Sequence, residues 1–192
     1  MSDPYLWPDG SCLANRLKIY DPHELRQAEA RIVSVRDVQL ARETLPGEYN
    51  LEHFQEFHLM LFGDVYEWAG KTRTVNISKD GSAFCSWQFV EDETSAVLAG
   101  LEKDNWFIGL KREGFVKRLA YYYGEMNARH PFREGNGRTQ RAFLRQLAAA
   151  AGWRLDWSAL NREDNIVASR QNLRTADIGL LVRVLEPVVV RI

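Results

Sequence analysis

The most informative part of the chain is residues 130–141, His130-Pro131-Phe132-Arg133-Glu134-Gly135-Asn136-Gly137-Arg138-Thr139-Gln140-Arg141, which we call the signature strip. The strip brings together one imidazole that can act as a base, one carboxylate, a Gly-Asn-Gly turn and two arginines three residues apart. The segments on both sides of it have helical patterns. This combination suits the binding of a polyphosphate with its metal ion and the removal of a proton from an attacking group.

The backbone of the strip is predicted to form an anion-binding turn. Pro131 disfavours helix at the residue before it, so the preceding helix should end near residue 128 or 129 and leave His130 extended in a loop. Glycine and asparagine tolerate positive φ, so Gly135, Asn136 and Gly137 can point successive N–H groups inward. A helix that begins near Gly137 adds the positive end of its dipole at the same point.

The charged side chains of the strip fit a nucleotide. Arg138 and Arg141 share one face of the first helical turn, where two guanidinium groups favour a phosphate between them. Glu134 can hold Mg²⁺ against phosphate oxygens, since Mg²⁺ usually takes one or two carboxylates together with substrate phosphates. The chain contains neither the P-loop motif nor the protein-kinase signatures. Taken singly, the histidine could be a helix cap, the Gly-Asn-Gly a turn and the arginines a solvated face, but their joint occurrence favours a functional site.

The strip resembles, position for position, the active-site signature of the Fic family, His-Pro-Phe-x-(Asp/Glu)-Gly-Asn-Gly-Arg-x-x-Arg. The resemblance implies an enzyme that transfers AMP from ATP to a hydroxyl of a target protein and releases diphosphate. It implies His130 as the general base, Glu134 as the ligand of Mg²⁺ and Phe132 as an anchor in the core. The other nucleotide contacts that it implies are Gly135, Asn136 and Gly137 as an anion hole, Arg138 on the β-phosphate and Arg141 on the γ-phosphate, with Arg133 and Thr139 beside them.

Residues 66–79 are similar to a second landmark of the same family, a helix end that runs into a β-hairpin flap. The interpretation gives one strand over residues 73–77, a turn near Gly81 and a return strand over residues 83–89. In the family the flap aligns the target segment by main-chain pairing, which assigns docking to Arg73, Thr74, Val75, Asn76 and Ile77. Lys79 and Asp80 at the tip are expected to contact the nucleotide. An ordinary surface hairpin is the alternative for this segment taken alone.

The rest of the chain predicts a mainly α fold, a Fic-type helical domain with a small β-hairpin flap over the active site. With 192 residues and 45% hydrophobic content, one domain over residues 1–192 is expected. Asp21 is expected to cap a helix over residues 22–42, and Asn50 to cap a second helix from residue 51 whose apolar stripe continues to Trp68. Further helices are expected over residues 90–103, 112–128, from 137 to a Gly152 cap, 158–172 and 175–186. His58 is predicted to be a hydrogen-bonded core residue, and His23 and His53 to be surface or capping groups. By analogy with the family, the polar face around Asn165 is expected near the adenine.

Composition and charge limit the location and the partners that are expected for the chain. The formal charge is −1 and no predicted helix carries a stripe of basic residues, so the charge pattern does not indicate binding of nucleic acid. No apolar run approaches the ~18 residues that a membrane span needs, and no signal-peptide pattern is visible. Cys12 and Cys85 fit no metal or redox spacing. These observations predict a cytoplasmic protein without membrane or direct nucleic-acid partners.

The resemblance also implies protein partners. The target carries a Ser, Thr or Tyr hydroxyl, and the similarity to stand-alone bacterial Fic toxins points to the ATPase subunit of a type II topoisomerase. Many Fic proteins carry an inhibitory helix, (Ser/Thr)-x-x-x-Glu-(Gly/Asn), whose glutamate pairs with the second arginine of the signature. Only Thr44 with Glu48 has this spacing here, and the Pro46-Gly47 centre does not suit a helix. We therefore expect a small antitoxin that brings the glutamate to Arg141 in trans, which makes the chain the toxin of a toxin–antitoxin pair.

Two alternatives keep the same fold. Transfer of another phosphate-containing group is typical of relatives that depart from the Gly-Asn-Gly-Arg stretch, which this chain keeps whole. A binding or regulatory module on the same scaffold would be favoured by loss of His130, Glu134 or Arg141, and all three are present.

Overall fold

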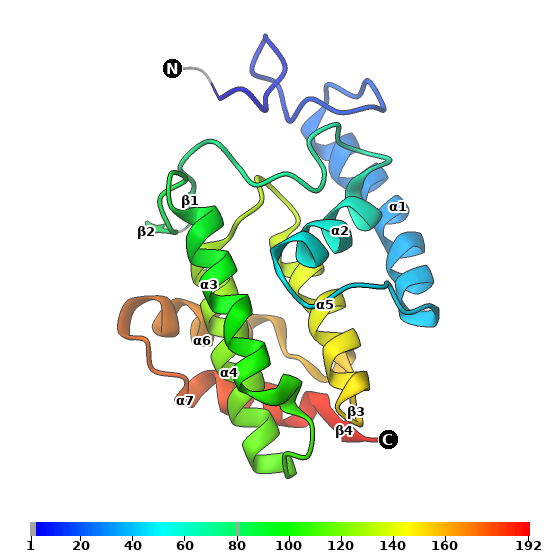
Figure 1. Cartoon of the computed structure of the whole chain (residues 1–192). Helices are drawn as coiled ribbons and strands as arrows, with labels where there is room; N and C mark the ends of the chain where they lie inside the picture. The colour runs from blue at the N-terminus through cyan, green and yellow to red at the C-terminus, as the bar shows by residue number, and fades with distance from the viewer. Residues whose placement is uncertain (1–2, 80) are drawn as a thin grey trace.

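The computed structural model describes residues 3–79 and 81–192 and shows a mainly helical fold (Figure 1). Its helices are α1 (Pro22–Arg42), α2 (Leu51–Phe62), α3 (Val90–Lys103), α4 (Arg112–Arg129), α5 (Asn136–Ala150), α6 (Arg162–Thr175) and α7 (Gly179–Leu185). The strands form two antiparallel pairs, β1 (Ser78–Lys79) with β2 (Ser82–Ala83), and β3 (Trp153–Leu155) with β4 (Val189–Arg191). The predicted fold class, mainly α with a small hairpin, is confirmed. None of the helices described combines the length and the hydrophobicity that crossing a bilayer requires.

Local sequence signals explain where the first two helices begin. The Asp21 carboxylate caps α1 by accepting from the Glu24 N–H at 2.7 Å, and a proline follows it in the first turn. Asn50 caps α2 in the same way and accepts from the His53 N–H at 3.0 Å. Both caps were predicted, because a short polar side chain before an apolar stripe satisfies N–H groups that the helix itself cannot.

The hydrophobic core joins two groups of helices (Figure 1). Phe143 of α5 is fully buried and packs its ring against Phe54 and Phe57 of α2, while α1 covers both helices. On the other side α4 contacts α3, α6 and α7. The loop between α4 and α5 carries the first part of the signature strip, so this loop is held between the two groups.

Several boundaries differ from the prediction. Helix α2 ends at Phe62 instead of following its apolar stripe to Trp68, because the chain continues in turns. Helix α6 begins after an Asn161 cap rather than at residue 158, and the left-handed backbone of Ala176 delays α7. The pair of β3 with β4 was not predicted, because strands of three residues far apart in the chain leave no periodic signal.

Two buried histidines connect loops to α2. His58 is fully buried, with its Nε2 at 3.0 Å from the Glu134 carbonyl oxygen and its Nδ1 accepting from the Gly70 N–H at 2.8 Å. The prediction of a hydrogen-bonded core histidine is confirmed. The prediction for His53 was wrong: it is 2% exposed, and its Nε2 lies 3.0 Å from the Leu45 carbonyl oxygen, because the loop before α2 folds back over the ring.

The flap is much shorter than predicted. Among the described residues of the flap, only Ser78–Lys79 and Ser82–Ala83 pair as strands, and Gly81 has φ +76°. Residues 73–77 are not strand, so the first predicted strand was wrong, and of the predicted return strand over residues 83–89 only Ala83 is strand. Asp80, which was expected to contact the nucleotide, lies outside the described residues.

Side-chain contacts explain why residues 73–77 do not form a strand. Arg73 is 1% exposed, and the Thr74 N–H donates to the Tyr5 hydroxyl at 3.0 Å. Asn76 accepts from the Trp87 N–H through its side-chain oxygen at 2.9 Å. These contacts fix the run against the body of the protein, which leaves it no second strand to pair with.

Candidate functional site

A cavity of about 680 Å³ lies among the hairpin, the signature strip and α6. The strip contributes His130, Arg133, Glu134, Asn136, Gly137, Gln140 and Arg141 to its wall. The hairpin and the residues beside it contribute Ile77, Ser78, Lys79, Ser82 and Phe84. The rest of the wall is made by Tyr123, Asn127, Trp157, Leu160, Arg162, Asn165, Ile166, Ser169, Arg170 and Leu173. Ligand pockets typically measure about 300–1,000 Å³, so the cavity has the size for a nucleotide.

His130 ends α4 and lines this cavity. The backbone of His130 is left-handed (φ 46°, ψ 59°), so the prediction of an extended residue was wrong. Because Pro131 disfavours a helical conformation at the residue before it, the helix ends with a left-handed C-cap at His130. Its Nδ1 lies 3.1 Å from the Asn127 carbonyl oxygen and therefore carries the proton of the neutral ring. The ring stacks on Phe84, with 3.9 Å between the centroids. Nε2 is left as an acceptor without a partner among the residues described.

The surroundings keep the His130 ring neutral. Burial lowers the pKa of His130 to about 4, and the positive charges of Arg73 and Lys79 also lower it. The hydrogen bond to the Asn127 carbonyl and the negative charge of Glu134 raise this pKa, but their effect is smaller than that of burial. At physiological pH the ring is therefore in the form that accepts a proton. An anionic ligand in the cavity would raise this pKa, since a negative charge stabilises the imidazolium.

Arg73 joins the hairpin to the His130 loop. Its guanidinium donates to the carbonyl oxygens of His130 (2.8 Å), Arg129 (3.1 Å), Val75 (2.7 Å) and Cys85 (2.5 Å). The carbonyls of Arg129 and His130 lie at the C-terminal end of α4, which is the negative end of the helix dipole. These backbone oxygens therefore stabilise the buried positive charge of Arg73. The sequence placed Arg73 on the target-docking edge, but its side chain points into the protein.

The Asn136 side chain closes the loop of the strip. Its Nδ2 donates to the Phe132 carbonyl at 2.7 Å, and its Oδ1 accepts from the Phe132 N–H at 2.8 Å; Phe132 is fully buried, as predicted. Gly135 has φ +82°, and a Cβ there would collide with the Phe62 ring. Thr139 is buried and donates to the Gly135 carbonyl at 3.1 Å, so it supports the turn and does not face the cavity.

The start of α5 offers backbone N–H groups to the cavity. The N–H groups of Arg138 and Thr139 both donate to the Gly135 carbonyl at 3.1 Å. Across residues 3–79 and 81–192, no hydrogen bond is found for the N–H groups of Asn136 and Gly137, and both residues line the cavity. Free N–H groups at a helix N-terminus form an anion-binding site.

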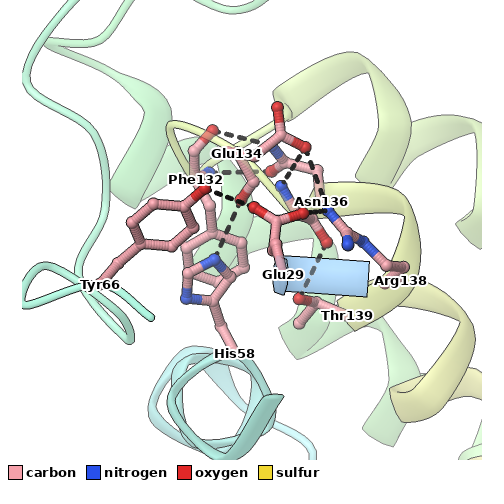
Figure 2. A network of polar contacts seen from close by, with 9 residues as sticks. Glu29, His58, Tyr66, Phe132, Glu134, Asn136, Arg138 and Thr139 are labelled. Carbon is pink, nitrogen blue, oxygen red and sulfur yellow. Dashed lines mark hydrogen bonds and ion pairs between the residues drawn. The ribbon is translucent and has the colours of Figure 1, made fainter. Parts of the chain in front are cut away.

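Arg138 and Arg141 of α5 point to different places. Arg141 lines the cavity, and no carboxylate in the described part of the chain lies within ion-pair distance of it. Arg138 is absent from the cavity wall. Its guanidinium lies 2.6 Å from the Glu29 carboxylate and 3.3 Å from the Glu134 carboxylate (Figure 2). It also lies 4.7 Å from the Phe62 ring centroid. The predicted phosphate site therefore has Arg141 on its wall and Arg138 behind it.

Glu134 is the carboxylate that can hold a metal ion. Its Oε1 accepts from the Gly135 N–H at 2.8 Å and from Arg138, whereas its Oε2 has no protein partner among the described residues. The side chain is 47% exposed and lines the cavity. No group of three His, Cys, Asp or Glu side chains gathers into a metal site in the part of the chain described. One carboxylate with a free oxygen beside an anion site fits Mg²⁺, which substrate phosphates help to hold.

The remaining predicted residues divide between the cavity and its surroundings. Lys79 lies on the cavity wall and is exposed. Arg133 also lines the cavity, but its guanidinium donates to the Asp3 carboxylate at 3.0 and 2.7 Å. Among the flap residues Ile77 reaches the cavity wall, and Thr74, Val75 and Asn76 do not.

Several residues in and around the site were not found from the sequence, among them Glu29, Tyr66 and Phe84. Glu29 lies on the buried face of α1 together with Leu25 and Val33. A carboxylate at a core position of an apolar stripe indicates a buried partner, and this signal was available in the sequence. Tyr66 and Phe84 gave no such signal, because aromatic residues are ordinary core residues.

Comparison with known proteins places this site in a family. Residues 48–148 match the Fic/DOC family. The chain is 42% identical over 168 residues to the protein adenylyltransferase VbhT of Bartonella schoenbuchensis, which covers 88% of this chain and 35% of that protein. It is 38% identical over 161 residues to the probable protein adenylyltransferase Fic of Escherichia coli, covering 84% of this chain and 80% of that protein. The chain thus spans about a third of one relative and four-fifths of the other.

Solved structures share the fold. The BepC protein of Bartonella tribocorum, solved with bound AMPPNP, matches with a TM-score of 0.92 at 24% identity over 98% of this chain and 97% of that one. The N-terminal Fic domain of a putative cell filamentation protein of Bartonella quintana, solved with bound ADP, matches with a TM-score of 0.92 at 26% identity over 97% and 94%. The predicted Fic-type helical fold is confirmed. The chain therefore belongs to the Fic/DOC family, and its domain is of the protein adenylyltransferase type, a class of nucleotidyltransferase.

Proposed function

We propose that this chain binds ATP with Mg²⁺ in the cavity and transfers AMP to a Ser, Thr or Tyr hydroxyl of a target protein. The observation that carries the proposal is the free Nε2 of His130 in the same cavity as the free N–H groups of Asn136 and Gly137. A base and an anion site in one cavity are what the reaction needs. Bound ADP in the Bartonella quintana domain supports a nucleotide as the ligand.

In the proposed reaction, Nε2 of His130 takes the proton of the target hydroxyl. The hydroxyl oxygen forms a bond to the α-phosphorus of ATP, and the bond from that phosphorus to the oxygen bridging the β-phosphate breaks. Diphosphate leaves with its negative charge, and AMP stays on the target as a phosphodiester. The N–H groups of Asn136 and Gly137 and the Arg141 guanidinium stabilise the phosphate charge during transfer.

Glu134 would hold Mg²⁺ through its free carboxylate oxygen. When bound, the ion neutralises charge on the phosphates and orients them. Removal of divalent metal with EDTA should therefore abolish transfer, and added Mg²⁺ should restore it.

A further part of the cavity wall suits the adenine ring. Asn165 lines the cavity, and its side-chain oxygen is buried without a hydrogen-bond partner among the residues described. A buried acceptor without a donor is unfavourable, and the amino group of adenine is a matching donor. Trp157 and Ile166 of the same wall supply apolar surface for the ring.

The hairpin is the proposed docking edge for the target. No hydrogen bond is found within the described chain for the N–H groups of Val75 and Ile77, next to β1. An extended segment of the target can pair with such an edge by β-strand addition. Ser78 and Ile77 lie on the cavity wall, so a paired segment would pass beside His130.

Incubation with α-labelled ATP, Mg²⁺ and a bacterial lysate tests the proposed transfer. The wild-type chain should label a protein band, and His130→Ala should lower labelling by about 10²–10⁴-fold while ATP binding stays unchanged. Label in the γ-position should not reach the protein, which separates AMP transfer from phosphorylation. The purified ATPase subunit of a type II topoisomerase serves as the named target. Near-normal labelling by His130→Ala would contradict the role of the base.

We further propose that the chain is a cytoplasmic toxin that a small antitoxin inhibits with a glutamate in trans. Arg141 has no carboxylate partner in the described chain, and the internal candidate Glu48 is exposed in a segment that is not helical. A partner can therefore reach Arg141 through the cavity. The chain should be harmful when expressed alone and harmless when co-expressed with the product of an adjacent small gene. A purified chain that is silent in self-modification until Glu48→Gly activates it would show instead that inhibition is internal.

A further inference from the structure

A buried carboxylate outside the signature strip reaches the site from α1. Glu29 is 7% exposed, and the other buried side chains of α1 are Leu25, Val33 and Leu40. One oxygen of Glu29 accepts from the hydroxyl of Tyr66, and the other lies 2.6 Å from a guanidinium nitrogen of Arg138 (Figure 2). An isolated buried carboxylate is unfavourable, so a glutamate at this position requires such partners.

Arg138 is held from several sides behind the cavity wall. The nitrogen that contacts Glu29 also lies 3.3 Å from Oε1 of Glu134, and the guanidinium covers the Phe62 ring. Arg141, about one helical turn later, lines the cavity, whereas Arg138 does not. Arg138 is thus directed at two carboxylates and away from the space that a nucleotide would fill.

The contact with Arg138 orients the Glu134 carboxylate. The guanidinium of Arg138 and the N–H of Gly135 both donate to Oε1, at 3.3 and 2.8 Å. Two donors on one oxygen fix the rotation of the carboxylate. The other oxygen, Oε2, has no partner among the described residues and is the one available to a cation.

We infer that Glu29 is a positioning residue, which holds Arg138 so that Arg138 holds Glu134 for Mg²⁺. The inference rests on the proposed role of Glu134 as the metal ligand. It changes the expected role of Arg138 from a ligand of the β-phosphate to the support of the metal-binding carboxylate. Arginine suits this role, because one terminal nitrogen with two N–H groups can donate to both carboxylates while the planar guanidinium packs on an aromatic ring.

The test measures how ATP binding depends on Mg²⁺, by calorimetry and without a target protein. In Glu29→Gln the Mg²⁺ concentration for half-maximal ATP binding should rise about 10–100-fold, the usual effect of losing a support of a metal ligand. ATP affinity in EDTA should stay at the wild-type value. Arg138→Lys keeps the charge but loses the planar guanidinium that packs on the Phe62 ring, so it should show the same pattern. The Arg138 side chain is 31% exposed, so a substitution there disturbs the core less than one at Glu29. Arg138→Lys therefore serves as a second variant if Glu29→Gln does not fold.

Asp37 and Arg145 provide a matched control. They form another ion pair between α1 and α5, at 2.9 Å, about two helical turns from Glu29 and Arg138. Neither residue lines the cavity. If Glu29 acted only by docking α1 on α5, Asp37→Asn would raise the Mg²⁺ requirement in the same way. An equal shift in Asp37→Asn and Glu29→Gln overturns the inference.

A double variant separates positioning from direct phosphate binding. Glu29→Gln/Arg138→Gln has the net charge of the wild type. If Glu29 acts through Arg138, the double variant requires no more Mg²⁺ than Arg138→Gln alone. A direct phosphate contact by Arg138 would instead weaken ATP binding by the double variant in EDTA, and this result overturns the inference.

Glu134→Gln tells a failure of the inference from a failure of the proposed function. An unchanged Mg²⁺ requirement in Glu134→Gln would remove Glu134 as the metal ligand. A raised requirement in Glu134→Gln together with a wild-type requirement in Glu29→Gln would refute only the role of Glu29. The binding titration involves no transfer step, so it is read independently of the labelling experiment.

Discussion

At the scale of single residues, the His130 ring owes its protonation state to its position. Its Nδ1 faces the Asn127 carbonyl, its face is covered by Phe84, and burial lowers its pKa to about 4. The ring is therefore neutral when the cavity is empty. A base of such low pKa is weak, and a nucleotide that raises the pKa would strengthen the base at the moment when it is needed.

We predict that the pKa of His130 depends on the nucleotide. In an NMR titration of the nucleotide-free chain, the ring should stay neutral down to about pH 5 and titrate near the low pKa. Addition of ATP with Mg²⁺ should move the pKa upward, because the complex brings net negative charge to the ring. His130→Ala identifies the signal. An ordinary pKa of about 6.5 in the nucleotide-free chain would contradict the prediction.

The glycine at position 135 is predicted to be required for two separable reasons. Gly135 and Gly152 share φ +82°, but a Cβ at Gly135 would collide with Phe62, whereas nothing lies within 4 Å of a Cβ at Gly152. Gly152→Ala should therefore cost about 1–2 kcal/mol in the free energy of unfolding, from backbone strain alone. Gly135→Ala should cost about 1–3 kcal/mol more, because the core must move. Urea unfolding measures both, and equal losses would mean that the Phe62 ring gives way freely.

At the scale of elements, the sequence predicted those parts that local signals control. The caps at Asp21 and Asn50 and the helix that follows Gly135 depend on neighbours in the chain, and these were predicted close to their positions. The predicted extent of the hairpin was wrong, because it depends on whether the Arg73 side chain faces solvent or donates to carbonyl oxygens that lie far along the chain. The same holds for Glu29, whose partners lie far along the chain.

The hairpin edge is predicted to serve the target and not the nucleotide. Val75→Pro removes an N–H that has no partner in the described chain, so the fold loses no hydrogen bond there. Target labelling should fall, since a docked segment would lose a main-chain donor, while ATP affinity should remain at the wild-type value. The melting temperature serves as the control for folding. A parallel loss of labelling and of ATP binding would make this run a folding support.

At the scale of the whole molecule, buried histidines are predicted to link stability to pH. Burial lowers the pKa of His58 to about 3 and that of His130 to about 4, below the model-peptide value of 6.5. Between these values the unfolded chain binds more protons than the folded chain, so stability decreases as pH falls below about 6.5. Each histidine should cost about 2 kcal/mol at pH 5 relative to pH 7.

Urea unfolding of the wild type and of His58→Gln at pH 7 and pH 5 measures this linkage. The variant should be less stable at pH 7, because it loses the contacts of the ring, but its stability should fall less on acidification. The difference between the two pH values should shrink by about 2 kcal/mol. An unchanged difference would mean that His58 accepts a proton in the folded chain.

We also propose that residues 1–192 unfold as one domain. The hydrophobic core is continuous from Leu25 in α1 to Val189 in β4, and it includes residues of α2, α4 and α5. Far-ultraviolet circular dichroism and tryptophan fluorescence should therefore report coincident urea transitions. Two separate transitions would show that part of the chain folds independently.

The buried guanidinium of Arg73 limits how the hairpin can diversify. Exchange of residues 78–83 between relatives that keep a lysine at position 79 would leave all four carbonyl acceptors of Arg73 in place, so new targets can be explored there without disturbing the loop that carries His130. An exchange that shifts the backbone at Val75 or Cys85 would displace a carbonyl acceptor and weaken the hold of Arg73 on the His130 carbonyl. The tip of the hairpin can thus be exchanged between relatives, whereas changes that move the carbonyl acceptors of Arg73 would alter the position of His130 and so affect the reaction itself.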